Sequence, residues 1–142
     1  MNIQEVMHEK PDRSSAKFEE TKVLVVEDQE DMQEMMVTFL RDMGLTRVVA
    51  VDNGLQAIRH INRSIGHLDL VICDWNIPQK DGSDVLRELR LLRPDMPFLM
   101  VTGRTDMDSV FIAQKLGVTS YLSKPFSAKE FEKRLRTLMS GC

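Results

Sequence analysis

The sequence has few cysteines, no long apolar run and no excess of basic charge. Its two cysteines, Cys73 and Cys142, are too few for a disulfide framework or a cysteine-based metal site. No apolar stretch approaches the ~20 residues of a membrane-spanning helix, and the N-terminus lacks the apolar core of a secretory signal. The 19 basic residues stand against 22 acidic ones, which argues against binding to nucleic acid through phosphate contacts. We therefore expect a cytoplasmic protein that binds neither membranes nor nucleic acid.

What the sequence does contain is typical of one folded domain. Its 142 residues are 42% hydrophobic and 29% charged, as in ordinary globular proteins. Residues 1–20 are polar, and Pro11 and Ser14 interrupt any long periodicity there. We predict a mobile N-terminal tail over residues 1–20 and a folded domain over residues 21–142.

Five short apolar runs recur along the folded part of the chain. They are Val23–Val26, Val48–Val51, Leu70–Cys73, Phe98–Val101 and Ser120–Leu122. The first four are continuous rather than alternating, which is typical of strands buried on both faces. The segments between them have helical spacing, most clearly in the methionine-rich stripe from Met32 to Met43, which we interpret as a core-facing helix ended by Gly44.

This repeated alternation of strand and helix indicates an α/β fold. We predict a flavodoxin-like (βα)5 architecture, in which a doubly wound parallel sheet of five strands has the order 2-1-3-4-5. Ligands of such sheets bind beyond the carboxyl ends of the strands, where the strand order reverses. The residues that follow each apolar run are therefore the candidates for a functional site.

Candidate residues follow four of the five runs. Glu27 and Asp28 follow the first run, Asp74 the third, Thr102 the fourth, and Lys124 comes just after the fifth. Each alone has an ordinary structural explanation, since Asp and Thr often cap helices or form turns and lysines are usually solvated. Their joint occurrence at one edge of the sheet favours a site.

The charges of this set call for a cation. Three carboxylates close together raise one another's pKa values or require a counterion, and the single ammonium of Lys124 neutralises only one of them. Oxygen ligands without histidine or cysteine are those that Mg²⁺ prefers. We predict a carboxylate–Mg²⁺ centre with room for a phosphoryl group.

Four motifs carry a resemblance to a known family. They are the acidic pair in VLVVEDQ, the segment VICDWNIPQKDG, the MVTG segment, and YLSKPF near the C-terminus. In this order they resemble the receiver domain of two-component response regulators, and in particular the CheY-like single-domain receivers of chemotaxis. The similarity covers residues 22–139, and the length leaves no room in this sequence for an output domain, so we expect a stand-alone receiver.

The resemblance implies a role for each residue of the acidic site. Asp74 would be the aspartate that accepts a phosphoryl group. The Mg²⁺ ion would be held by Glu27, Asp28, Asp74 and the backbone carbonyl of Asn76. Glu27 departs from the more frequent aspartate at its position, and its longer side chain could alter the geometry of the metal site.

The resemblance also implies a switch. Lys124 would pair with the phosphoryl oxygens, and its peptide bond to Pro125 would be cis. Thr102 would hydrogen-bond to a phosphoryl oxygen after transfer, and Tyr121 would change rotamer. Arg104 and Asn76 flank the predicted site and are candidate modulators of the phosphate lifetime.

The expected function is signalling rather than catalysis, beyond the receiver's own phosphorylation and dephosphorylation. The phosphodonor would be a sensor histidine kinase or a histidine phosphotransferase, and a target protein would dock near Asp106–Met139. A phosphorelay shuttle that returns its phosphoryl group to a histidine phosphotransferase is the alternative within the family.

Two other classes share parts of the pattern. A haloacid-dehalogenase-type phosphatase also uses a nucleophilic aspartate and Mg²⁺, but it has an aspartate where Asn76 stands here. A flavin-binding flavodoxin would need a phosphate-binding loop after the first strand, where this chain is acidic. Both are remote alternatives.

Overall fold

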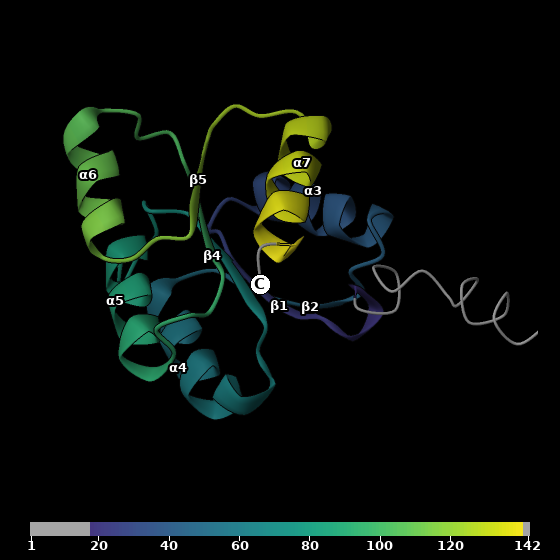
Figure 1. Cartoon of the computed structure of the whole chain (residues 1–142), viewed down its shortest axis with the longest axis horizontal. Helices are drawn as coiled ribbons and strands as arrows, with labels where there is room; N and C mark the ends of the chain where they lie inside the picture. Colours follow the sequence, from purple (N-terminus) through teal and green to yellow (C-terminus); the bar gives the residue numbers. More distant parts are fainter. Residues whose placement is uncertain (1–17, 141–142) are drawn as a thin grey trace, which may run out of the picture.

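A computed structural model describes residues 18–140, and its centre is a parallel β-sheet (Figure 1). The strands are β1 (Lys22–Val26), β2 (Arg47–Val51), β3 (Leu70–Cys73), β4 (Phe98–Thr102) and β5 (Ser120–Ser123). They pair in the order β2-β1-β3-β4-β5, and every pairing is parallel. The predicted fold class and strand order are confirmed, and the order reverses between β1 and β3.

Helices cover both faces of the sheet. They are α3 (Glu30–Asp42), α4 (Gly54–Ser64), α5 (Gly82–Leu92), α6 (Met107–Lys115) and α7 (Ala128–Ser140), and a short 3-10 turn, η1 (Ile65–His67), follows α4. Helices α3 and α7 pack on one face, and α4, α5 and α6 on the other (Figure 1). No helix within residues 18–140 is long and apolar enough to cross a membrane.

The chain ends its helices and begins new ones with local signals. Gly44 has φ 96° and ends α3, because glycine adopts a left-handed backbone without strain. Asn53, Asp81 and Asp106 accept backbone N–H bonds at the starts of α4, α5 and α6. These caps fix where each loop at the carboxyl edge of the sheet ends.

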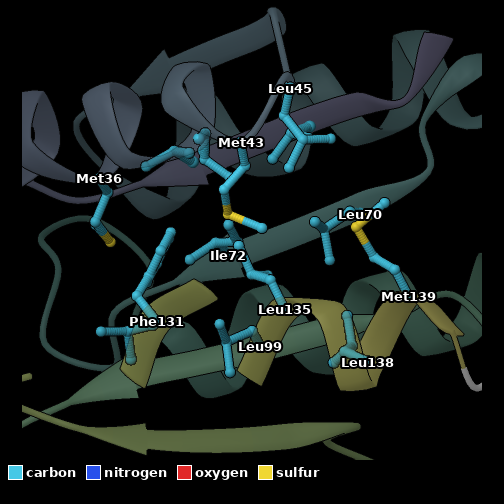
Figure 2. Close-up of a cluster of buried hydrophobic side chains, with 14 of the residues drawn as sticks. Met36, Met43, Leu45, Leu70, Ile72, Leu99, Phe131, Leu135, Leu138 and Met139 are labelled. Carbon is cyan, nitrogen blue, oxygen red and sulfur yellow. The ribbon is translucent and has the colours of Figure 1, made fainter. Parts of the chain in front are cut away.

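The core between the sheet and helices α3 and α7 is rich in methionine. Met36 and Met43 of the predicted stripe pack with Phe131 and Leu135 of α7 over Ile72 of the central strand (Figure 2). Met32 and Phe39 are partly buried at its margin. The interpretation of this stripe as a core-facing helix is confirmed.

The folded part of the chain includes residues that the sequence placed in the tail. The side chain of Phe18 is buried, and the Arg136 guanidinium lies 5.4 Å from the centre of its ring. The backbone N–H of Thr21 donates to the Phe18 carbonyl. The rest of the predicted tail, residues 1–17, lies outside the described residues, so its mobility stays a prediction.

Candidate functional site

The sheet brings three carboxylates together at its carboxyl edge. Val26 and Cys73 are partners in the pairing of β1 with β3, so the residues that follow them lie side by side. Glu27, Asp28 and Asp74 each offer an oxygen, and these three atoms lie within 4.8 Å of one another. Glu27 is fully buried, Asp74 is nearly so, and Asp28 is exposed. The cluster is therefore open to solvent on the side of Asp28.

Lys124 reaches this cluster from the far edge strand. Its Nζ donates to Glu27 Oε1 at 2.7 Å and to Asp74 Oδ2 at 2.8 Å. Its backbone N–H donates to the carbonyl of Thr102, and the peptide bond between Lys124 and Pro125 is cis, as expected. One ammonium thus links residues from β1 and β3 to the loop after β5.

Burial and pairing shift the ionisation of this set. Burial raises the pKa of Glu27, and the hydrogen bond from Lys124 only partly opposes that effect. Partial burial alone would lower the pKa of Lys124, but its hydrogen bonds to Asp74 and Glu27 outweigh it and hold the pKa above its ordinary value. The ammonium is therefore firmly charged at neutral pH.

The donor set fits Mg²⁺. It consists of three carboxylates from two adjacent strands with a single cation paired to them, so charge remains to be neutralised. All the ligand atoms are oxygens, and the exposed Asp28 leaves an open side for the water molecules that Mg²⁺ usually retains. These residues can hold Mg²⁺ at this edge of the sheet.

Asn76 and Arg104 meet beside the cluster. The backbone N–H of Asn76 donates to Asp74 Oδ1 at 3.2 Å. The guanidinium of Arg104 donates twice to Asn76 Oδ1, at 3.0 and 2.9 Å, and lies 4.9 Å from the centre of the Trp75 ring. The two predicted modulators thus form one bridge between the loops that follow β3 and β4.

Thr102 and Tyr121 are connected through the backbone of Arg104. The Arg104 N–H donates to the hydroxyl of the buried Thr102 at 3.2 Å, and the Tyr121 hydroxyl donates to the Arg104 carbonyl. Partial burial raises the pKa of Tyr121, so its hydroxyl keeps its proton. The predicted switch residues are therefore neighbours through one intervening residue.

Sequence reasoning missed Gln33, which braces the site from α3. Its side-chain amide donates to the carbonyls of Glu27 and Val51 and to Asp52 Oδ1, at 3.0, 3.2 and 3.1 Å. It thereby ties the end of β1 to the end of β2. A glutamine one turn into a helix has no distinguishing pattern, so no sequence signal could have identified it.

The comparisons with known proteins agree with this geometry. The model of the response regulator receiver domain matches residues 23–136. The chain is 32% identical over 119 residues to the chemotaxis protein CheY of Pseudomonas aeruginosa, covering 82% of this chain and 94% of that protein. It is also 32% identical over 116 residues to CheY-3 of Vibrio cholerae, covering 80% and 88%.

A solved structure shows the same fold. The response regulator receiver domain protein from Clostridium thermocellum superposes with a TM-score of 0.77 at 27% identity, over 84% of this chain and 94% of that one. Receiver domains act in phosphorylation-dependent signalling rather than as classical enzymes, and they bind Mg²⁺ at an acidic pocket. This chain belongs to the response regulator receiver domain family, and within it to the CheY-like receivers.

Proposed function

We propose that Asp74 accepts a phosphoryl group from a phosphohistidine and that the phosphorylated protein signals by binding a target. The donor would be a sensor histidine kinase or a histidine phosphotransferase. The observation that carries the proposal is the gathering of Glu27, Asp28 and Asp74 within 4.8 Å around a lysine hydrogen-bonded to two of them.

The contacts of Asp74 suit a nucleophile. Lys124 holds Oδ2 and the Asn76 N–H holds Oδ1, so the carboxylate is fixed in one orientation. In the transfer, an Asp74 oxygen forms a bond to phosphorus while the bond from phosphorus to the donor imidazole nitrogen breaks, and the electron pair stays on that nitrogen. Such reactions depend mainly on positioning and on neutralising the charge of the phosphoryl oxygens.

Charge neutralisation comes from two sources in this proposal. Lys124 supplies a fixed ammonium beside Asp74. The carboxylates of Glu27, Asp28 and Asp74, with the backbone carbonyl of Asn76, would hold Mg²⁺. When bound, the ion supplies positive charge to the phosphoryl oxygens.

Thr102 and Tyr121 would convert phosphorylation into a conformational signal. The Thr102 hydroxyl accepts a hydrogen bond from Arg104, and its own proton is available to a phosphoryl oxygen on Asp74. A shift of Thr102 toward that oxygen would move the Arg104 backbone, to which Tyr121 is bonded. One new hydrogen bond at the site would thus change the rotamer of the Tyr121 ring on β5.

Arg104 and Asn76 would set the lifetime of the phosphorylated form. The backbone N–H of Asn76 donates to Asp74, and Arg104 is held to the Asn76 side chain and against the Trp75 ring. A guanidinium in this place occupies part of the route by which water reaches the acyl phosphate. We expect its removal to speed the loss of phosphate.

The target would dock on the surface formed by Asp106–Met139. Helix α6 exposes Met107, Phe111 and Ile112, with relative exposures of 87%, 57% and 46%. Helix α7 adds an exposed basic side that includes Lys129 and Lys133. An apolar ridge with flanking positive charge suits a protein partner whose docking surface is apolar and acidic. We propose that this binding takes place in the cytoplasm.

The test is phosphorylation by acetyl phosphate, or binding of beryllofluoride, in the presence of Mg²⁺. Both are expected to change the fluorescence of Trp75, which adjoins Asp74, and acetyl phosphate should add one phosphoryl group by intact mass. Asp74→Asn should abolish the covalent product, whereas Asp95→Asn, at the opposite edge of the sheet, should leave it unchanged. Stable phosphorylation of Asp74→Asn at an aspartyl bond would contradict the assignment.

A further inference from the structure

The loop after β3 is supported from outside the acidic site. Residues 74–81 connect β3 to α5 and include Asn76. The backbone carbonyl of Asn76 is a proposed Mg²⁺ ligand, and its side-chain amide oxygen accepts from Arg104. Trp75 and Ile77 anchor the loop in the hydrophobic core, and backbone contacts hold the remainder of it. Its contacts with its neighbours therefore decide where the Asn76 carbonyl lies.

One of these contacts is made by Gly54, the first residue of α4. The Gly54 N–H donates to the carbonyl of Pro78 at 3.1 Å. A β-carbon on Gly54 would lie 1.7 Å from the carbonyl oxygen of Lys80 and 2.5 Å from its carbonyl carbon. The backbones of α4 and the loop thus touch directly, at a place where no other residue type fits.

The requirement for glycine at this position is spatial. Within residues 18–140 the glycines with positive φ are Gly44 and Gly117, so the backbone of Gly54 is in a region that any residue can adopt. The two nearest atoms in conflict belong to the backbone of Lys80, and they cannot move away by a rotamer change as the end of a side chain could. A larger residue at position 54 must displace the loop or the start of α4.

The loop has little freedom to absorb such a displacement internally. At its far end the Gly82 N–H donates to the Trp75 carbonyl at 2.8 Å, and a β-carbon on Gly82 would lie 2.4 Å from the Asp74 carbonyl oxygen. In its middle, Gln79 has φ 76°, an uncommon conformation for a residue with a side chain. A displacement of the backbone at Pro78–Lys80 should therefore also displace the backbone at Asn76.

We propose that Gly54 is a positioning residue for the Mg²⁺ site. By admitting the Pro78–Lys80 backbone, it sets the position of the loop that carries the Asn76 carbonyl, a proposed Mg²⁺ ligand. Gly54 itself touches neither the ion nor Asp74. This inference rests on the proposed function, because it assigns a support to the metal site that the function requires.

The test compares Gly54→Ala with Gly66→Ala in the full chain. Gly66 has open space around the position of a β-carbon, so its substitution controls for the general effect of replacing a glycine. Mg²⁺ affinity is measured by titration of Trp75 fluorescence. We expect Gly54→Ala to weaken Mg²⁺ binding by about tenfold or more, the usual effect of losing a support of metal ligands, and Gly66→Ala to bind as the wild type does.

A second readout separates positioning from a general loss of structure. Because the carboxylates and Lys124 are intact in Gly54→Ala, its rate of phosphorylation by acetyl phosphate should recover toward the wild-type rate as Mg²⁺ is raised to saturation. A folded Gly54→Ala protein with wild-type Mg²⁺ affinity would overturn the proposal. So would a phosphorylation rate that stays low at saturating Mg²⁺.

The wild-type protein supplies a measurement that needs no substitution. In amide NMR spectra, the Gly54 resonance should shift along the same Mg²⁺ titration curve as Asn76, while the Gly66 resonance stays in place. If Gly54→Ala does not fold, an unmoved Gly54 resonance at saturating Mg²⁺ in the wild type would overturn the proposal. Failure of the wild type to bind Mg²⁺ at all would contradict the proposed function as well, which distinguishes the two.

Discussion

The two loops that flank Asp74 are built differently. The loop after β3 is fixed by backbone contacts at Gly54 and Gly82. The loop after β4, residues 103–106, is exposed throughout, and a β-carbon on Gly103 would meet nothing within 4 Å. It is held mainly by the hydrogen bonds of Arg104. A loop with a fixed backbone suits a metal ligand, which must keep one position. A loop held by a few hydrogen bonds that can break and re-form suits a conformational switch.

The largest expected effect comes from removing the cation that pairs with Glu27 and Asp74. Lys124→Ala leaves the buried Glu27 carboxylate and Asp74 without their partner, and loss of one member of a buried ion pair typically costs about 3 kcal/mol or more. We expect a drop of that order in the free energy of unfolding, measured by urea denaturation without Mg²⁺. Mg²⁺ should still bind and restore part of the stability, while the switch is weakened.

Two further measurements sharpen this result. Adding Glu27→Gln to Lys124→Ala should recover stability, because it removes the uncompensated charge, whereas Lys129→Ala on the exposed side of α7 should have little effect. Because the pKa of Lys124 is raised in the folded protein, its contribution to stability is fully present below its ordinary pKa and is lost as the pH rises through the folded value. Wild-type stability at all pH values in Lys124→Ala would contradict the structure of the site.

Substitution of the helix caps tests the comparison of the loops directly. Asp81 caps α5 at the end of the fixed loop and forms a reciprocal capping box with Asp84. Asp81→Ala should cost about 1 kcal/mol of stability and should also weaken Mg²⁺ binding in a fluorescence titration. Asp106→Ala removes the matching cap of α6 and should leave Mg²⁺ affinity unchanged. Equal effects of both substitutions on Mg²⁺ would remove the distinction between the loops.

Tyr121→Phe tests the connection between β5 and the loop after β4, residues 103–106. The substitution removes the hydrogen bond to the Arg104 carbonyl and should lower stability by about 0.5–1 kcal/mol, as the loss of one hydrogen bond usually does. Phosphorylation by acetyl phosphate should proceed at the wild-type rate, because Asp74 and its ligands are untouched. A large fall in that rate would show that Tyr121 belongs to the site rather than to its readout.

The smallest effect on stability is expected for Arg104→Ala. The side chain is exposed, so its bonds to Asn76 and its contact with Trp75 contribute little to folding. Trp75 fluorescence should change, and the phosphorylated form should lose phosphate faster, as followed by intact mass against time. The matched control is Arg87→Ala, which removes an exposed arginine that pairs with Asp84 on α5.

Most of the fold and the principal members of the candidate site follow from the sequence for a simple physical reason. In a parallel sheet every strand ends at the same edge, so residues just after the buried runs become neighbours once the strand order is known. That reasoning brought together Glu27, Asp28 and Asp74, with Lys124 and Thr102 beside them, and the structure places them so. Their chemical roles remain proposals.

The parts that the sequence did not predict depend on loop conformation. The start of α5 is set by the capping box of Asp81 and Asp84, which does not depend on apolar periodicity. The contact of Gly54 with Lys80 and the bridge from Arg104 to Asn76 join segments with no common periodicity. The burial of Phe18 was missed because a lone aromatic residue in a polar stretch has no pattern.

The span of the Lys124 contacts makes the acidic centre a late product of folding. Lys124 is separated along the chain by 97 residues from Glu27 and by 50 from Asp74, and contacts of such long range form only after much of the chain has been ordered. A nascent or truncated polypeptide that stops short of residue 124 contains Asp74 but lacks the ammonium beside it. Under the proposed function, phosphorylation of Asp74 beside Lys124 therefore requires that β1, β3 and β5 have already been assembled into the sheet.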